Sequence, residues 1–154
     1  MKTIASAALL MYAGCVALTL SPSDFSWPIE SELTADKNGM VNEDRYHLRF
    51  NVKPLLFEEL QDSLKVSGKT FRVIRDQEGY YFISGPQFKN VYVFEHSAAG
   101  LSQVAKIKVS QQGLVNPAFN KRPPHIQLLS GREKPLYLNR YGIQTPAEQG
   151  GSTR

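Results

Sequence analysis

An acid, a base and a hydroxyl follow one another at Glu95-His96-Ser97, and these are the residue types that activate a nucleophile in hydrolases. Consecutive residues rarely aim their side chains at one point, so this run indicates the end of a strand rather than a catalytic triad. Glu58-Glu59 similarly suggests paired carboxylates for acid–base chemistry. On a helix the two would point about 100° apart, and we expect both to face solvent.

The histidines and the cysteine do not form a set of metal ligands. The chain has three histidines, of which His47 is expected on the exposed side of a strand and His125 in a loop after Pro123-Pro124. The one cysteine excludes an internal disulfide and a cysteine-based zinc site. The sequence also has no GxSxG, Walker, dinucleotide-binding or HExxH motif. It therefore predicts a protein that is not an enzyme, with no cofactor and no small-molecule substrate.

The net charge of +4 lies entirely in the second half of the chain. Residues 1–77 carry nine basic and ten acidic side chains, whereas residues 78–154 carry nine basic and four acidic ones. Such a basic region favours an acidic protein partner or an anionic lipid surface. Nucleic acid is not expected, because no nucleic-acid motif is present and the N-terminus resembles an export signal. The basic residues assigned to partner binding are Lys106, Lys108, Lys121 and Arg122.

The N-terminus, residues 1–20, is typical of a secretory leader: Lys2 precedes a long stretch without charge. Ala13-Gly14-Cys15 resembles the end of a bacterial lipobox, although Tyr12 stands where that motif usually has leucine. We expect lipidation at Cys15. Ordinary cleavage after Ala17 or Ser23 remains open.

Two other fates of this segment also remain open. Thr3 to Leu20 is 18 residues long, the lower limit for an uncleaved membrane anchor. A buried core helix of a cytoplasmic protein is the fourth alternative. The leader pattern favours a periplasmic protein associated with the outer membrane.

Residues 21–44 are polar, without a helical or strand period, and predict an extended tether. Phe25 and Trp27 within it are candidate partner-binding residues, since exposed aromatics in a linker can dock a partner. Packing of these rings on their own domain is the alternative.

Residues 45–110 are expected to form the folded domain. Strict apolar–polar alternation over 46–52 predicts a strand, and Pro54 then starts a helix that runs to Val66, with a leucine at every fourth position and Gly68 as its cap. Further strands are expected at 69–75, 80–83, 90–95 and 103–110. The predicted fold class is α+β: a small, mostly antiparallel sheet with one packed helix, in a βαββ-type core.

The strands that flank the helix are expected to pair in parallel. The leucine stripe is expected to cover a sheet face that consists of Leu48, Phe50, Val52, Phe71 and Val73. Residues 111–154 contain many prolines and predict an irregular, loop-rich, basic C-terminal third, in which 126–129 and 136–138 are possible edge strands.

The stretch from Tyr46 to Ile83 resembles the short N-terminal domain of secretins and TonB-dependent receptors. The similarity rests on a strand at 48–52, a helix with spaced leucines from Pro54 to Leu64, and Gly68 before a β-branched strand. Small lipoproteins of type IV secretion outer-membrane complexes carry a similar domain. The chain is too short for the barrel or ring that a secretin or receptor has, so the resemblance implies an assembly subunit without catalytic residues.

Two functions follow as hypotheses. The first is a non-catalytic structural subunit of a bacterial cell-envelope assembly, such as a secretion or conjugation outer-membrane complex, with other subunits as partners and the membrane contacted through the N-terminus. The second is a stand-alone periplasmic binding or inhibitor module that recognises an acidic partner through its basic C-terminal half.

Overall fold

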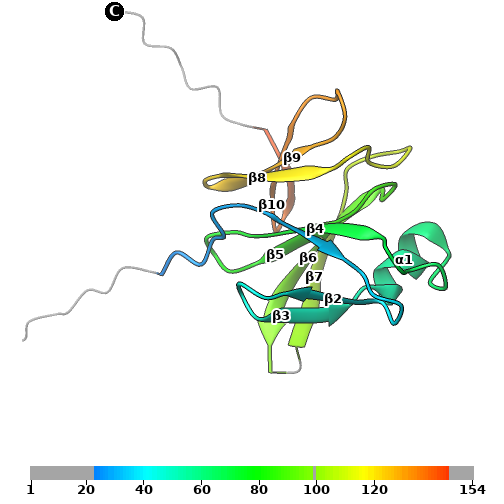
Figure 1. Cartoon of the computed structure of the whole chain (residues 1–154). Helices are drawn as coiled ribbons and strands as arrows, with labels where there is room; N and C mark the ends of the chain where they lie inside the picture. The colour runs from blue at the N-terminus through cyan, green and yellow to red at the C-terminus, as the bar shows by residue number, and fades with distance from the viewer. Residues whose placement is uncertain (1–22, 99, 146–154) are drawn as a thin grey trace, which may run out of the picture.

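Three antiparallel sheets and one short helix make up the fold in a computed structural model that describes residues 23–98 and 100–145. The strand orders are β1-β4-β5-β6-β7, β11-β10-β9-β8 and β2-β3 (Figure 1). The elements are β1 (Ser31–Thr34), β2 (Met40–Glu43), β3 (Leu48–Asn51), α1 (Lys53–Leu60), β4 (Thr70–Arg75), β5 (Tyr81–Ser84), β6 (Asn90–Ser97), β7 (Gly100–Lys108), β8 (Ala118–Arg122), β9 (His125–Leu129), β10 (Leu136–Asn139) and β11 (Gly142–Gln144).

The predicted α+β class is wrong, because the protein is mostly β and has no βαββ core. The strands on either side of the helix do not pair with each other: β3 pairs with β2, whereas β4 lies between β1 and β5. The expected core residues Leu48, Val52, Phe71 and Val73 are buried, and Phe50 is partly buried. They come from two different sheets, so they do not form the single sheet face that was predicted.

The helix ends at Leu60, six residues before the predicted end at Val66. Gln61 takes a left-handed conformation, with φ 55°, and its N–H donates to the carbonyl oxygen of Phe57. The Asp62 side chain then accepts the backbone N–H groups of Leu64 and Lys65. This turn competes with the helix for backbone donors. Leu64, expected on the core-facing stripe, is consequently 91% exposed.

The segment 21–44, for which we expected a tether, supplies the two strands β1 and β2 from its described residues. Each strand is short and has a polar residue at a buried position, Ser31 in β1 and Glu43 in β2. The apolar–polar alternation that would predict a strand is therefore absent from the sequence. Arg45 joins these two residues, since its guanidinium donates to the Ser31 hydroxyl and to both carboxylate oxygens of Glu43.

The C-terminal third is a sheet rather than an irregular extension. The expected edge strands at 126–129 and 136–138 correspond to β9 and β10, which lie in the middle of the four-stranded sheet. The outer strands β8 and β11 were missed. Only Phe119 of β8 is a buried apolar residue, and β11 is three residues long, so neither gives a periodic signal.

The five-stranded sheet lies between the two smaller sheets (Figure 1). The four-stranded sheet is above it in this view, with contacts from β8 to β4 and from β11 to β7. The β2–β3 hairpin lies below it, and α1 lies at the right of this view. One continuous hydrophobic core joins all three sheets, and its largest fully buried side chains include Phe71, Phe82, Phe88 and Tyr92.

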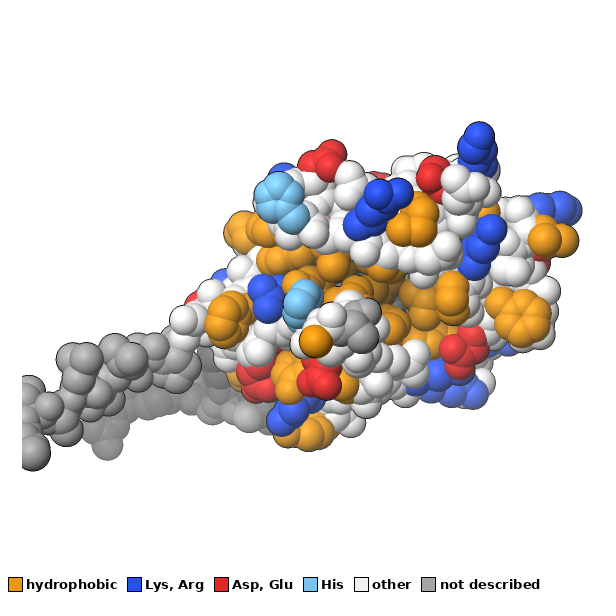
Figure 2. Space-filling view, turned by 90° about the horizontal axis from the view of Figure 1, so that it is seen from below, with side chains coloured by type: hydrophobic (Ala, Val, Ile, Leu, Met, Phe, Trp, Pro, Cys, Tyr) orange, Lys and Arg blue, Asp and Glu red, His pale blue; other side chains and the backbone are white. Residues whose placement is uncertain are grey.

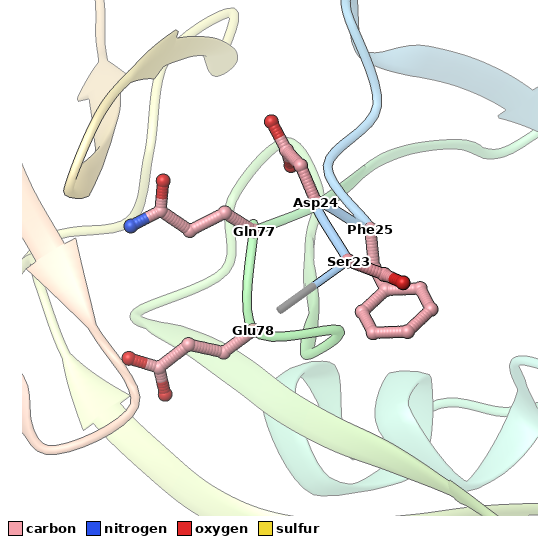
Figure 3. Close-up of a pocket in the computed structure, with 5 residues that line it drawn as sticks. All are labelled: Ser23, Asp24, Phe25, Gln77 and Glu78. Atoms are coloured by element: carbon pink, nitrogen blue, oxygen red, sulfur yellow. The ribbon is translucent and has the colours of Figure 1, made fainter. Parts of the chain in front are cut away.

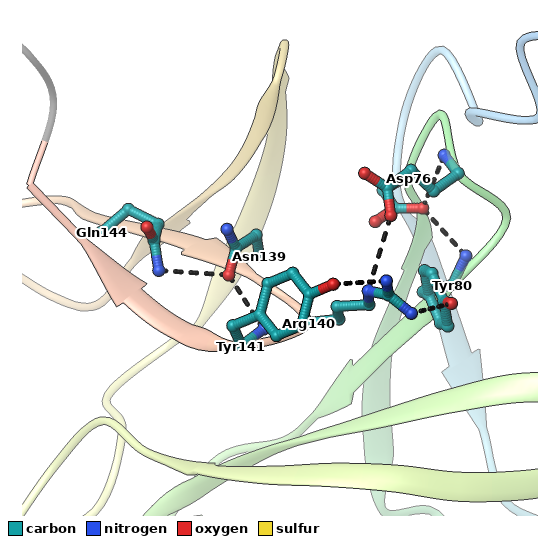
Figure 4. A network of polar contacts seen from close by, with 7 residues as sticks. Asp76, Tyr80, Asn139, Arg140, Tyr141 and Gln144 are labelled. Carbon is teal, nitrogen blue, oxygen red and sulfur yellow. Dashed lines mark hydrogen bonds and ion pairs between the residues drawn. The ribbon is translucent and has the colours of Figure 1, made fainter.

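Polar side chains also tie the sheets together. Glu30 accepts the backbone N–H of Phe119 at the start of β8, at 2.6 Å, and a guanidinium N–H of Arg72 in β4, at 3.0 Å. At another junction, Arg140 donates to the hydroxyl groups of Tyr80 and Tyr141 (Figure 4). Arg140 lies in the β10–β11 turn, so this network joins the four-stranded sheet to the β4–β5 hairpin.

Candidate functional site

A groove runs between β3 and the β6–β7 hairpin, and we call it the β3–β7 groove. It consists of two adjoining hollows of about 400 and 350 Å³, which share Arg49, Gly100 and Leu101. β3 and α1 form one wall, and β7 forms the other. The face seen in Figure 2 shows hydrophobic surface at the bottom of a hollow, with Lys, Arg and His side chains and also acidic side chains around it.

One end of the groove is apolar. The β2–β3 hairpin and α1 cover only part of the five-stranded sheet, which leaves a strip beside β5, β6 and β7 open. Phe94 and Leu101 are only partly buried there. The apolar residues that line this end are Phe50, Pro54, Leu55, Ile83, Phe94 and Leu101.

The other end of the groove is basic. His47, Arg49, Arg75 and His96 line it, together with Tyr46 and Tyr81 but without an acidic residue. None of these four basic side chains takes part in an ion pair within residues 23–98 and 100–145. The positive charges of Arg49 and Arg75 are therefore available to an anionic group that enters the groove.

Local backbone geometry places these side chains. His47 occupies the β2–β3 turn with φ 53°, a left-handed conformation that reverses the chain and exposes the ring. The Arg75 guanidinium lies 5.0 Å from the Tyr81 ring centroid, and its Nε donates to the Gly79 carbonyl oxygen at 3.1 Å. Arg75 is thus held in place by the β4–β5 hairpin.

The residues considered for catalysis do not converge. His96 lines the groove, whereas the Ser97 hydroxyl donates to the Gly100 carbonyl oxygen within the β6–β7 turn. His125 is the first residue of β9 rather than part of a loop, and its Nδ1 is buried without a hydrogen-bond partner among the described residues. Within those residues, no group of three His, Cys, Asp or Glu side chains could hold a metal ion.

Glu58 and Glu59 have different environments, although both were expected to face solvent. Glu58 is exposed and pairs with Lys106 of β7 at 2.5 Å. Glu59 instead accepts the Lys89 backbone N–H, the Asn90 side-chain amide and the Tyr92 hydroxyl. The prediction is wrong for Glu59, because the end of α1 packs against the start of β6.

The two aromatic residues that were expected to bind a partner differ in burial. Trp27 is 3% exposed and belongs to the hydrophobic core, whereas Phe25 is 48% exposed at the surface. Cys15 and the leader at 1–20 lie outside the described residues, as does the tail from Ala147. Among the described residues, no helix is long and apolar enough to cross a membrane.

The four basic residues assigned to partner binding do not form one patch with common contacts. Lys106 and Lys108 are exposed on β7, and Lys106 is paired with Glu58 of α1. Lys121 and Arg122 lie on β8, where Lys121 contacts Asp24 at 3.4 Å. The Lys106 and Lys121 side chains are thus already neutralised by carboxylates within the chain.

A separate hollow, outside the β3–β7 groove, lies between residues 23–25 and the β4–β5 turn (Figure 3). Asp24 and Glu78 are its two acidic residues, and their side chains point away from each other. Asp24 accepts hydrogen bonds from both the backbone and the hydroxyl of Ser26, and these lower its pKa. The arrangement holds no pair of groups that could act on one ligand atom.

Sequence reasoning missed the β3–β7 groove, because its residues are dispersed from Tyr46 to Gln103. The one available signal was the basic cluster His47 and Arg49 beside a strand. Comparisons of the chain with protein-family models, with curated proteins and with solved structures found no match.

Proposed function

We propose that this protein is a non-catalytic structural subunit of a bacterial cell-envelope assembly, and that it contacts a neighbouring subunit through the β3–β7 groove. The observation that carries the proposal is an open apolar groove with a basic end on a domain whose candidate catalytic groups do not converge. Exposed hollows of this kind are typical of docking sites.

The envelope location draws on the sequence. The leader pattern at 1–20, with Cys15 as a lipidation site, favours a protein on the periplasmic side of the outer membrane. The resemblance of residues 46–83 to a domain found in secretion-complex lipoproteins favours a role in assembly.

The alternative, a stand-alone module that binds an acidic partner through its C-terminal half, has less support. Lys106 and Lys121, two of the residues it depends on, already form ion pairs within the chain. The basic end of the groove comes instead from residues 47–96.

Site-specific photo-crosslinking combined with gentle detergent extraction tests the proposal. A photoreactive amino acid at Gln103, which lines the groove, is compared with the same amino acid at Ser102. Ser102 is an exposed neighbour whose side chain points to the opposite face of β7, because side chains alternate along a strand.

We expect a crosslink from Gln103 but not from Ser102. The crosslinked species should migrate in a stoichiometric, high-mass complex that is stable in moderate salt. A protein that stays monomeric after extraction, or a complex that disperses as salt screens exposed charges, would contradict the assembly function.

A further inference from the structure

We propose that the β3–β7 groove binds an extended segment of a partner protein as an added strand on the free edge of β3. Apolar side chains of that segment would enter the apolar end of the groove, and carboxylates at its C-terminal end would meet the basic end. The inference rests on the proposed function, since it specifies the chemistry of the partner at the same site.

The first observation is the free edge itself. Among residues 23–98 and 100–145, β3 pairs only with β2. The Val52 N–H donates toward the β2 side, to the Gly39 carbonyl oxygen at 2.8 Å. Because backbone groups alternate along a strand, those of Arg49 and Asn51 point to the other side, where both residues line the groove. Such an edge is a ready template for an incoming strand.

The second observation sets the direction of that strand. Gly100 lies near the beginning of β3, whereas Lys106, farther along β7, meets Glu58 in the helix that follows β3. β3 and β7 therefore run the same way on the two sides of the groove. Antiparallel pairing is slightly more stable per residue than parallel pairing. A strand added antiparallel to β3 is also antiparallel to β7, and its C-terminal end lies at the basic end.

The third observation is chemical complementarity. Alternate side chains of an added strand would face Phe94, Leu101 and Leu55 at the apolar end. Its last residues would reach the basic end, where Arg49 and Arg75 form no ion pair within residues 23–98 and 100–145 and His47 and His96 lie beside them. The groove thus fits an apolar segment that ends in acidic side chains or a C-terminal carboxylate.

Charge also favours a partner protein over a second copy of this chain. Antiparallel pairing of β3 with the same strand of another copy would bring the C-terminal end of that strand, with Asn51 and then Lys53, to the basic end, so it would add a cation there and no carboxylate. Like charges on neighbouring strands are destabilising. An apolar segment whose carboxylates lie at its C-terminal end meets no such repulsion, because the groove's acidic residue, Glu58, lies at the apolar end and is paired with Lys106.

The probe is a short synthetic peptide in which Val and Thr alternate and which ends in two Asp residues. We expect it to bind the wild-type protein, as followed by calorimetry. Two N-methylated versions test the mode of binding, because an N-methyl group removes a backbone donor without a change to the protein. Methylation of the alternate residues that face β3 should weaken binding at least about tenfold, whereas methylation of the other set should be tolerated.

Two protein variants test the charge. Arg49→Glu should weaken binding of the acidic peptide about tenfold or more. A peptide that ends in two Asn residues should bind the wild type and Arg49→Glu with similar affinity. Arg132→Glu, at an exposed position outside the groove, makes the same change in net charge and should leave binding within about twofold of wild type.

Several results would overturn the inference. These are equal tolerance of both methylated peptides, equal effects of the two Arg variants, and a concentration-dependent dimer that the peptide does not displace. Binding to anionic vesicles that Arg49→Glu abolishes, without binding to any peptide, would assign the basic end to lipid and also refute it. If no peptide binds but Gln103 still crosslinks within a high-mass complex, this inference fails and the proposed function stands.

Discussion

The indole ring of Trp27 stacks on the phenol ring of Tyr46, with ring centroids 4.1 Å apart and an angle of 11° between the planes. Tyr81 meets the same indole edge-on at 5.7 Å. The stack joins the segment before β1 to the β2–β3 turn. Since Tyr46 and Tyr81 also line the basic end of the groove, this aromatic cluster supports the wall on which the candidate site depends.

Trp27→Ala should lower the free energy of unfolding by about 3–5 kcal/mol, because it leaves a cavity beneath the β2–β3 turn. Urea unfolding followed by circular dichroism measures the change. Phe25→Ala is the matched control. Its ring is half exposed and lies beneath the Arg75 guanidinium, so a loss below about 1 kcal/mol is expected. Equal losses in both variants would show that Trp27 is not in the core.

Glu59→Ala should destabilise the protein by about 2–4 kcal/mol, because it leaves three donors at the start of β6 without their acceptor. Burial and the neighbouring Glu59 carboxylate also raise the pKa of Tyr92, so this hydroxyl stays protonated and donates. Glu58→Ala on the same helix removes only a partly exposed ion pair, and about 0–1 kcal/mol is expected. Thermal unfolding of the two variants provides the comparison, and a larger loss from Glu58→Ala would contradict this assignment.

Local patterns predicted the central part of the fold well. The hairpin of β4 and β5, its turn at 76–79 and the strand β6 correspond to runs of β-branched and aromatic residues between turn residues. These segments are buried in the five-stranded sheet, so their apolar character is visible in the sequence itself.

The pairing of the strands was not predictable in the same way. A strand–helix–strand order favours parallel neighbours, but the shortened α1 leaves β3 in a separate sheet with β2. β1 and β2 were missed because Ser31 and Glu43 occupy buried positions where the pattern requires apolar residues. Arg45, which is distant from Ser31 in the sequence, donates hydrogen bonds to both side chains and so compensates their burial. The groove was missed for the same reason, since it arises from the packing of separate segments.

The stability contributed by Glu43 should depend on pH. Hydrogen bonds from Arg45 hold the pKa of Glu43 at about 2, below its ordinary value of 4.5, even though the carboxylate is buried. A lowered pKa means that this contribution is fully present above pH 4.5 and is lost as the pH falls toward 2. We expect Glu43→Gln to be about 2–3 kcal/mol less stable than wild type at pH 7, with allowance for solvent around the half-exposed Arg45.

The same comparison at low pH isolates the contribution that the charge of Glu43 makes to stability. Burial raises the pKa of both Glu30 and Asp76, so protonation of these two groups favours the folded state as the pH falls and partly offsets the loss. Both proteins share that effect, and the difference between them does not contain it. Denaturant unfolding from pH 7 to 2 should therefore show a gap that closes near pH 2. A gap that stays constant with pH would mean that the charge of Glu43 makes no contribution.

Arg140 should control how firmly the β10–β11 hairpin is held against the five-stranded sheet. Its guanidinium donates to the Tyr80 and Tyr141 hydroxyls and lies over both rings, 4.9 and 4.6 Å from their centroids. Arg140→Ala should lower global stability by only about 1–2 kcal/mol but accelerate hydrogen exchange selectively in β10 and β11.

Two further variants make that result specific. Arg140→Lys keeps the charge but not the planar fork of donors, so only partial protection of β10 and β11 is expected. Arg132→Ala removes an exposed arginine of the neighbouring β9–β10 loop and should leave the exchange unchanged. Exchange in β10 and β11 that is the same in Arg140→Ala as in wild type would show that apolar packing, with Leu138 fully buried, holds this hairpin without Arg140.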